Sequence, residues 1–210
     1  MYILFLKVYK MKRILLIVFA IIYLSGCRSF YINQAIKAPD RQYTEKLPTL
    51  EPVFENEQEV KHWIPGEKLV RENSHWATLF YREVDKNIIN SNGSQQGYIV
   101  LRPIIHQQQV TGGGWTLLSL CTLYLPNFIG MPFASNTAFS ELELDILNKN
   151  GELIKRYSAE SEDTEYVAMW WGYNEINAPN AAMYNSYRNS LGDLVKQVMN
   201  DREYLIQQLK

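Results

Sequence analysis

The sequence has 210 residues and a net charge of −1, and 47% of its residues are hydrophobic, which is enough for the core of one ordinary domain. The first 26 residues hold four of the 21 basic side chains and none of the 22 acidic ones, so the remainder carries a net charge of −5. No basic face is available to offset phosphates, which argues against nucleic acid as a partner. Two cysteines exclude a disulfide framework.

The chain begins with a segment typical of a secretory signal peptide. The basic pair Lys12-Arg13 precedes an apolar run over 14–24, which is shorter than the roughly 20 residues of a spanning helix. The run closes with Leu24-Ser25-Gly26-Cys27, which resembles the lipobox of bacterial lipoproteins. This resemblance implies signal cleavage between Gly26 and Cys27, and a diacylglyceryl and N-acyl lipid anchor on Cys27. Residues 1–26 are therefore interpreted as the signal, with Met11 as the expected true start.

The resemblance to lipoproteins also implies a place in the cell envelope. If the host is Gram-negative, the absence of Asp directly after Cys27 favours the outer membrane, with the domain facing the periplasm. Residues 27–46 are polar and aperiodic, so we expect a tether, followed by a single α/β domain over 47–210. With Cys27 lipidated, Cys121 lacks a partner within the chain and is expected to be a buried small hydrophobe.

The first half of the domain contains three expected elements and a turn. Two prolines in 47–54 are compatible only with an edge strand, and 62–66 reads as a turn. Apolar side chains recur every fourth position over 76–89, which predicts an amphipathic helix with Ser74 as its N-cap. Residues 98–105 are rich in β-branched side chains and predict a strand, in which Pro103 indicates an edge or a bulge.

The second half predicts a hairpin and a long helix. Apolar and acidic residues alternate over 141–146, the turn sequence Asn148-Lys149-Asn150-Gly151 follows, and 152–157 is the expected return strand of a hairpin over 141–157. The acidic run 160–165 is interpreted as a solvated turn before a further strand at 166–171. A helix is expected over 177–199, with a short final turn ending at Leu209. The whole order predicts an α/β fold: a small sheet of about four to five strands with two main amphipathic helices packed on it.

An uncharged stretch extends from Gln107 to Ser140, and we interpret it as an apolar insertion in the domain. Its centre, 115–133, allows three interpretations: a buried strand and loop of the core, two short helices broken at Pro126 and inserted shallowly in the membrane, or a membrane-crossing strand of an oligomeric pore. The side chains that would contact a membrane are Trp115, Leu117, Leu118, Leu120, Leu123, Tyr124, Phe128, Ile129 and Phe133.

Motifs for catalysis, phosphate binding or metal binding are missing from the sequence. The three histidines stand apart, without Cys or acidic residues at ligand spacing, so we expect no metal, no cofactor and no enzymatic activity. The aromatic group Trp170, Trp171 and Tyr173 is compatible with a ledge that binds peptide or glycan, but packing in the core is the favoured interpretation.

The segments 47–52, 129–132 and 150–157 resemble uncharacterised bacterial lipoproteins. The order of elements is similar to the N-terminal domain of TolB and to envelope-assembly lipoproteins such as the curli secretion lipoprotein and penicillin-binding-protein activators. The lipid anchor, the acidic mature domain, the aromatic residues and the missing catalytic motifs together predict a membrane-tethered, non-enzymatic binding or assembly module of the periplasm, with another envelope protein or a second copy as its partner. The alternatives are an oligomeric pore or export subunit that uses 115–133, and an envelope hydrolase with an unrecognised site.

Overall fold

The computed structural model describes residues 29–31, 35, 43–55, 74–90 and 92–210. The expected signal segment, the lipidation site Cys27 and the turn at 62–66 lie outside these residues. One mixed sheet has the strand order β1-β2-β3-β4. Strand β1 (Leu50–Phe54) pairs in parallel with β2 (Gly97–Thr111). Strands β2, β3 (Ala134–Asn148) and β4 (Leu153–Val167) pair antiparallel.

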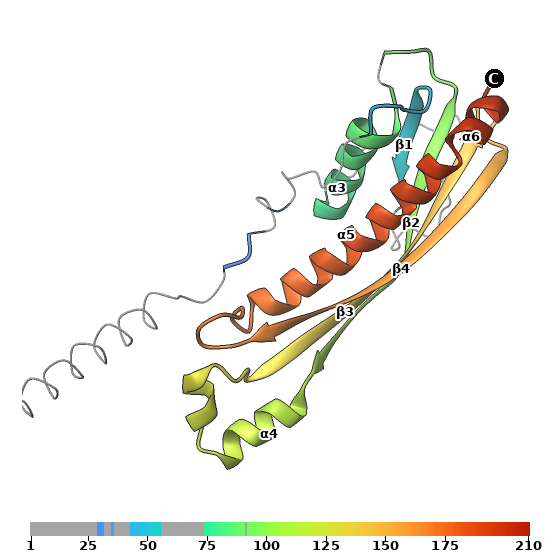
Figure 1. Cartoon of the computed structure of the whole chain (residues 1–210). Helices are drawn as coiled ribbons and strands as arrows, with labels where there is room; N and C mark the ends of the chain where they lie inside the picture. Colours follow the sequence, from blue (N-terminus) through green and yellow to red (C-terminus); the bar gives the residue numbers. More distant parts are fainter. Residues whose placement is uncertain (1–28, 32–34, 36–42, 56–73, 91) are drawn as a thin grey trace, which may run out of the picture.

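The helices pack on the sheet, which confirms the expected α/β class. Helix α5 (Asn177–Asn200) lies along one face, over β3 and β4, and α6 (Arg202–Gln208) continues past a break at Asp201 (Figure 1). Ala181, Ser186 and Ser190 are fully buried on α5, and these small side chains let the helix approach β3 closely. The Ser190 hydroxyl donates to the backbone oxygen of Ser140 on β3 at 2.9 Å.

The first helix begins where the sequence places it. In α3 (His75–Glu83), the Ser74 hydroxyl accepts a hydrogen bond from the backbone nitrogen of Ala77, so the predicted N-cap is confirmed. The helix widens into one π-helical segment, η1 (Val84–Ile88), which continues the apolar face into the core. Leu47, fully buried, then pairs with Ile89, which attaches the start of the domain to the end of this helix.

The hairpin is also confirmed, and its strands are longer than predicted. Gly151 closes the turn with a φ of +81°, a left-handed conformation that glycine adopts without strain. The predicted bulge is present as a shift of register between Pro103 and Ile105. Proline has no backbone N–H to donate to a neighbouring strand. Pro103 avoids this loss on the β1 side, because β1 pairs with β2 only up to Leu101.

Three expectations were wrong. The acidic run 160–165 is not a turn but the middle of β4, and Tyr166 and Val167 end that same strand instead of starting another. Of the three interpretations left open for the uncharged stretch, the core strand is excluded, because residues 113–121 form a helix. Cys121, expected to be buried, is exposed at the end of that helix. The error at Cys121 arises because an apolar run is normally buried and here it projects from the sheet.

On the face of the sheet away from α5, an ion-pair network joins the three long strands. Asp145 on β3 is only 3% exposed and accepts hydrogen bonds from Arg102 on β2 and from Arg156 on β4. The Arg156 contacts measure 2.7 and 2.9 Å and use both carboxylate oxygens. Arg102 also pairs with Glu55, just after β1, so the network spans the width of the sheet.

Candidate functional site

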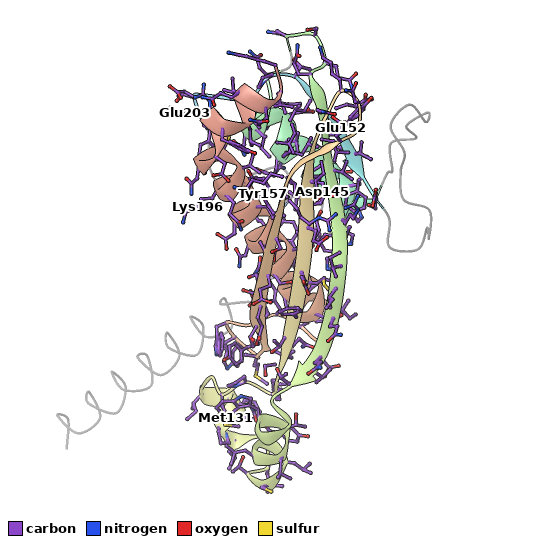
Figure 2. All side chains as sticks on the ribbon, turned by 90° about the vertical axis from the view of Figure 1, so that its right-hand side faces the viewer. Met131, Asp145, Glu152, Tyr157, Lys196 and Glu203 are labelled. Atoms are coloured by element: carbon purple, nitrogen blue, oxygen red, sulfur yellow. The ribbon has the colours of Figure 1, made fainter. Side chains whose placement is uncertain are left out.

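The candidate site is the segment that joins β2 to β3, residues 113–133, which we call the apolar tip. It consists of helix α4 (Gly113–Cys121) and the 3-10 helix η2 (Leu125–Ile129). Figure 1 shows α4 projecting beyond the end of β2 and β3, at the end of the molecule opposite to α6. In Figure 2, Met131 marks the tip, and Glu152, in the turn between β3 and β4, marks the opposite end.

Backbone conformations specific to this stretch turn the chain twice. Gly112 starts α4 with a φ of +80°, and a Cβ there would lie 2.5 Å from the Ser135 hydroxyl oxygen, so glycine is required on both grounds. After α4, Leu123 and Tyr124 adopt left-handed conformations, with φ values of 51° and 61°. Pro126 then stands in the first turn of η2, where its missing N–H costs no hydrogen bond.

Large hydrophobic side chains of the tip point into solvent. Exposed fractions reach 79% for Leu123 and 89% for Ile129, values more typical of charged side chains than of Leu or Ile. The exposed members of the tip are Trp115, Leu117, Leu118, Leu120, Leu123, Tyr124, Leu125, Phe128 and Ile129. Monomeric soluble proteins rarely leave such contiguous apolar surface uncovered, and patches of this kind mark interaction sites.

Several polar groups of the tip are bonded within the protein, whereas the buried Ser119 hydroxyl and the side-chain oxygen of Asn127 have no hydrogen-bond partner among the described residues. The side-chain nitrogen of Asn127, which is fully buried, donates to the backbone oxygens of Met131 and Pro132 at 3.0 and 3.3 Å. The Thr122 hydroxyl donates to the Leu118 oxygen, and the Thr116 hydroxyl donates to the Phe133 oxygen. The loop around η2 is thus held by internal hydrogen bonds while its apolar side chains face outward.

Two adjacent tryptophans fasten the tip to the rest of the domain. The indole nitrogen of Trp170 donates to the Phe128 oxygen at 3.0 Å, and that of Trp171 donates to the Gly130 oxygen at 2.7 Å. Both tryptophans follow the end of β4, so they connect η2 to the outer strand of the sheet. The sequence around this pair is compatible with a binding ledge or with packing in the core. The structure shows a third arrangement, in which the pair holds η2.

The first described residues of the chain pack near the same end. The ring of Phe30 contacts Tyr173 edge-on at 6.3 Å between centroids, and it contacts Tyr184 on α5 at 5.5 Å. The Tyr184 hydroxyl donates to the backbone oxygen of Ala35 at 2.8 Å. Tyr173 belongs to the segment of Trp171, two residues away, so the start of the chain and the tip meet on neighbouring surfaces.

The structure brings eight of the nine predicted membrane-contact side chains together as exposed residues of the tip. The ninth, Phe133, is half-buried and packs against Tyr124 at 6.1 Å between ring centroids. Leu125 is 68% exposed and was missed, although it lies in the same uncharged stretch. Phe30 was also missed. Its place three residues after the predicted lipidation site was the available signal.

The polar cluster around His106 lies between the sheet and α5. His106 contacts the Ser140 hydroxyl at 3.2 Å, which in turn contacts the Ser186 hydroxyl at 2.8 Å, and burial lowers the pKa of His106. Both serines are fully buried, so a substrate cannot reach either hydroxyl. Among the described residues, no group of His, Cys, Asp or Glu side chains is placed to hold a metal ion.

A cavity of about 440 Å³ opens beside α5. Its lining includes Glu83 and Asp193. Glu83 already accepts hydrogen bonds from Arg82 at 2.9 Å and from Asn87 at 2.6 Å. Both partners hold this carboxylate in place between α3 and η1. The Glu83 carboxylate in the cavity wall is therefore already hydrogen-bonded, and no residue of the tip lines the cavity.

Within the described part of the chain, no helix has both the length and the hydropathy needed to cross a bilayer. No protein-family model matches the sequence, and no curated protein matches it either. Among solved structures, the chain is similar to a crystal structure described as a "putative lipoprotein" from Caulobacter crescentus CB15. The identity is 12%, the TM-score is 0.34, and the similarity covers 67% of this chain and 87% of the other.

Proposed function

We propose that this protein is an envelope lipoprotein, tethered through a lipid on Cys27, that acts as a non-enzymatic binding module and uses the apolar tip as its contact surface. In a Gram-negative host it is anchored in the outer membrane and faces the periplasm. The observation that carries the proposal is the tip itself, where nine large hydrophobic side chains are exposed at one end of the sheet.

The way in which the sheet and two tryptophans hold the tip supports a binding role. Strands β2 and β3 pair along 15-residue lengths and carry α4 and η2 at their ends, while Trp170 and Trp171 hold η2 from the side. A surface that is presented rigidly loses less conformational entropy when it binds than a flexible loop would. The exposed residues therefore form a preorganised surface at one end of a long, stiff sheet.

The chemistry of the described residues favours binding over catalysis. A hydrolase needs a nucleophile or an acid–base pair that a substrate can reach. The histidine–serine contact of His106 and Ser140 leads into the core towards Ser186, away from solvent. The tip, whose large side chains are exposed, carries no ionisable side chain other than Tyr124 and Cys121.

Photo-crosslinking in cells tests the proposal. A photoreactive side chain at Leu120 or Ile129 of the tip should form crosslinked products, whereas the same side chain at Leu153 should form none. Leu153 is a suitable control because it is 52% exposed and lies beside the turn at the opposite end. Absence of products at both tip positions, or equal yield at Leu153, would contradict the assignment of the tip as the contact surface.

A further inference from the structure

The composition of the tip restricts what can cover it. From Gln107 to Ser140 the sequence has no charged residue and no histidine. A site that binds a protein normally has an apolar centre and a rim of polar and charged groups in contact with water. Here the exposed surface is made of Leu, Ile and Phe together with Trp115 and Tyr124, which are 39% and 44% exposed. Trp and Tyr are enriched where a protein meets the boundary between water and lipid.

We infer that the apolar tip inserts into a lipid bilayer, in the leaflet that holds the lipid on Cys27. This inference rests on the proposed function and names the partner of its contact surface. The partner is the layer of acyl chains just below the lipid headgroups. The inserted side chains are those of α4 and η2 that the structure leaves exposed, with Leu120, Leu123 and Ile129 among them.

The internal hydrogen bonds of the tip fit this environment. Lipid offers no partner to a backbone N–H or C=O, so non-helical backbone enters it only when its polar groups are satisfied within the protein. Around η2, Asn127 bonds two backbone oxygens, and Trp170 and Trp171 bond those of Phe128 and Gly130. The backbone nitrogen of Met131 also bonds the Pro126 oxygen at 3.0 Å.

The size of the tip sets the depth of insertion. With nine residues, α4 is about 14 Å long at a rise of about 1.5 Å per residue, less than half of the roughly 30 Å hydrocarbon core. Insertion is therefore shallow, in the range of about 5–10 Å that is typical of interfacial helices. Because the tip has no cationic side chain, we expect its binding to be insensitive to anionic lipid and to salt.

The position of Phe30 allows both attachments to reach one leaflet. Phe30 follows Cys27 by three residues, which span at most about 11 Å of extended chain. Phe30 packs on Tyr173, and Trp171 of the same segment bonds the tip. The acyl chains on Cys27 attach the chain to the membrane, and insertion of the tip adds a second contact that fixes the orientation of the domain. With both in place, the sheet stands on the membrane with α6 pointing away.

The exposed Cys121 provides a direct test. In the mature chain, residues 27–210, carrying Cys27→Ala, Cys121 is the only cysteine. We would label it with an environment-sensitive fluorophore and add vesicles of phosphatidylcholine, or of phosphatidylethanolamine with phosphatidylglycerol. The inference predicts a blue shift, quenching by nitroxide-labelled lipid, protection from iodide, and the same result in both lipid mixtures at low and high salt. A probe that stays accessible to iodide with both vesicle types would overturn it.

Matched serine variants control for non-specific adsorption. Leu120→Ser and Ile129→Ser replace exposed side chains, so the fold should persist, and each should weaken vesicle binding about tenfold. Leu153→Ser makes the same change at the opposite end and should leave binding unchanged; an equal loss there would overturn the inference. If the vesicle test fails while tip positions crosslink to a protein in cells, the lipid inference is wrong and the proposed function stands. If both fail, both are wrong.

Discussion

The attachment of the tip by Trp171 gives a prediction whose size follows from the structure. Trp171→Phe keeps an aromatic ring and removes the donor that bonds the Gly130 oxygen at 2.7 Å. A neutral hydrogen bond contributes about 1 kcal/mol, so the equilibrium for opening η2 should shift about fivefold. The double variant with Trp170→Phe also removes the bond to the Phe128 oxygen, and about 2 kcal/mol corresponds to about 30-fold.

Amide hydrogen exchange measures this opening residue by residue. The amides of Gly130 and Met131, bonded to the oxygens of Asn127 and Pro126, should exchange faster by these factors, while amides in the middle of α5 keep their rates. Trp115→Phe is the matched control, because Trp115 also lies in the tip and its indole nitrogen donates no hydrogen bond to the described residues. Unchanged exchange in the tip, or equal acceleration in α5, would refute the reasoning.

Three further predictions concern stability. Burial lowers the pKa of His106 in the folded protein below its unfolded value of about 6.5. Below pH of about 6.5 the unfolded chain therefore binds more protons than the folded chain, and the free energy of unfolding should decrease as the pH falls. Urea titrations at pH 5 and 7.5 should show this decrease, reduced in His106→Asn; equal pH dependence would contradict it. Asp145→Asn removes the carboxylate that Arg102 and Arg156 bond, and it should lower the free energy of unfolding by about 2 kcal/mol. The loss is moderate because both arginines retain some access to water. The control Glu143→Gln, whose contact is longer, should cost under about 0.5 kcal/mol, and equal losses would argue against the network. Ser74→Ala should cost about 1 kcal/mol by thermal denaturation, and an unchanged midpoint would show that the N-cap contributes nothing.

Local chemistry was enough to predict much of the fold. Ser74 is a helix N-cap because its hydroxyl reaches the Ala77 nitrogen, and Gly151 closes a hairpin because the turn needs a positive φ. Pro103 indicated a bulge because it has no N–H to offer the ladder. Each of these depends on a few neighbouring residues, which the sequence displays directly.

The acidic run was misread because its surroundings are not local. Alternation places Ser161, Asp163 and Glu165 on one face of β4 and Glu160 and Glu162 on the other. Asn185 of α5 donates to Asp163 and Glu165 at 3.2 and 2.9 Å, so two of the acids face the helix. Burial raises the pKa of Asp163. No pattern within the run shows that a distant helix supplies these bonds.

The nature of the tip was left open for a related reason. A run of apolar residues fits a core strand as well as an exposed helix, because hydropathy does not state which surface will cover it. Pro126 and Gly130 correctly indicated a break in the run. The sequence could not show how far the flanking strands extend. Strand β2 continues to Thr111 and β3 begins at Ala134, so the two strands carry the apolar run beyond the part of the sheet that α5 covers.

The central claim, that the apolar tip is a contact surface that inserts into the membrane, is tested most directly by membrane retention in cells. The Cys27→Ala variant would be exported on a cleavable signal that adds no lipid, and membranes would be washed with high salt. The account predicts that this variant stays with the membranes, that adding Leu120→Ser and Ile129→Ser releases it, and that adding Leu153→Ser does not. Full release of the Cys27→Ala variant would contradict the account, because the lipid on Cys27 would then be the sole attachment.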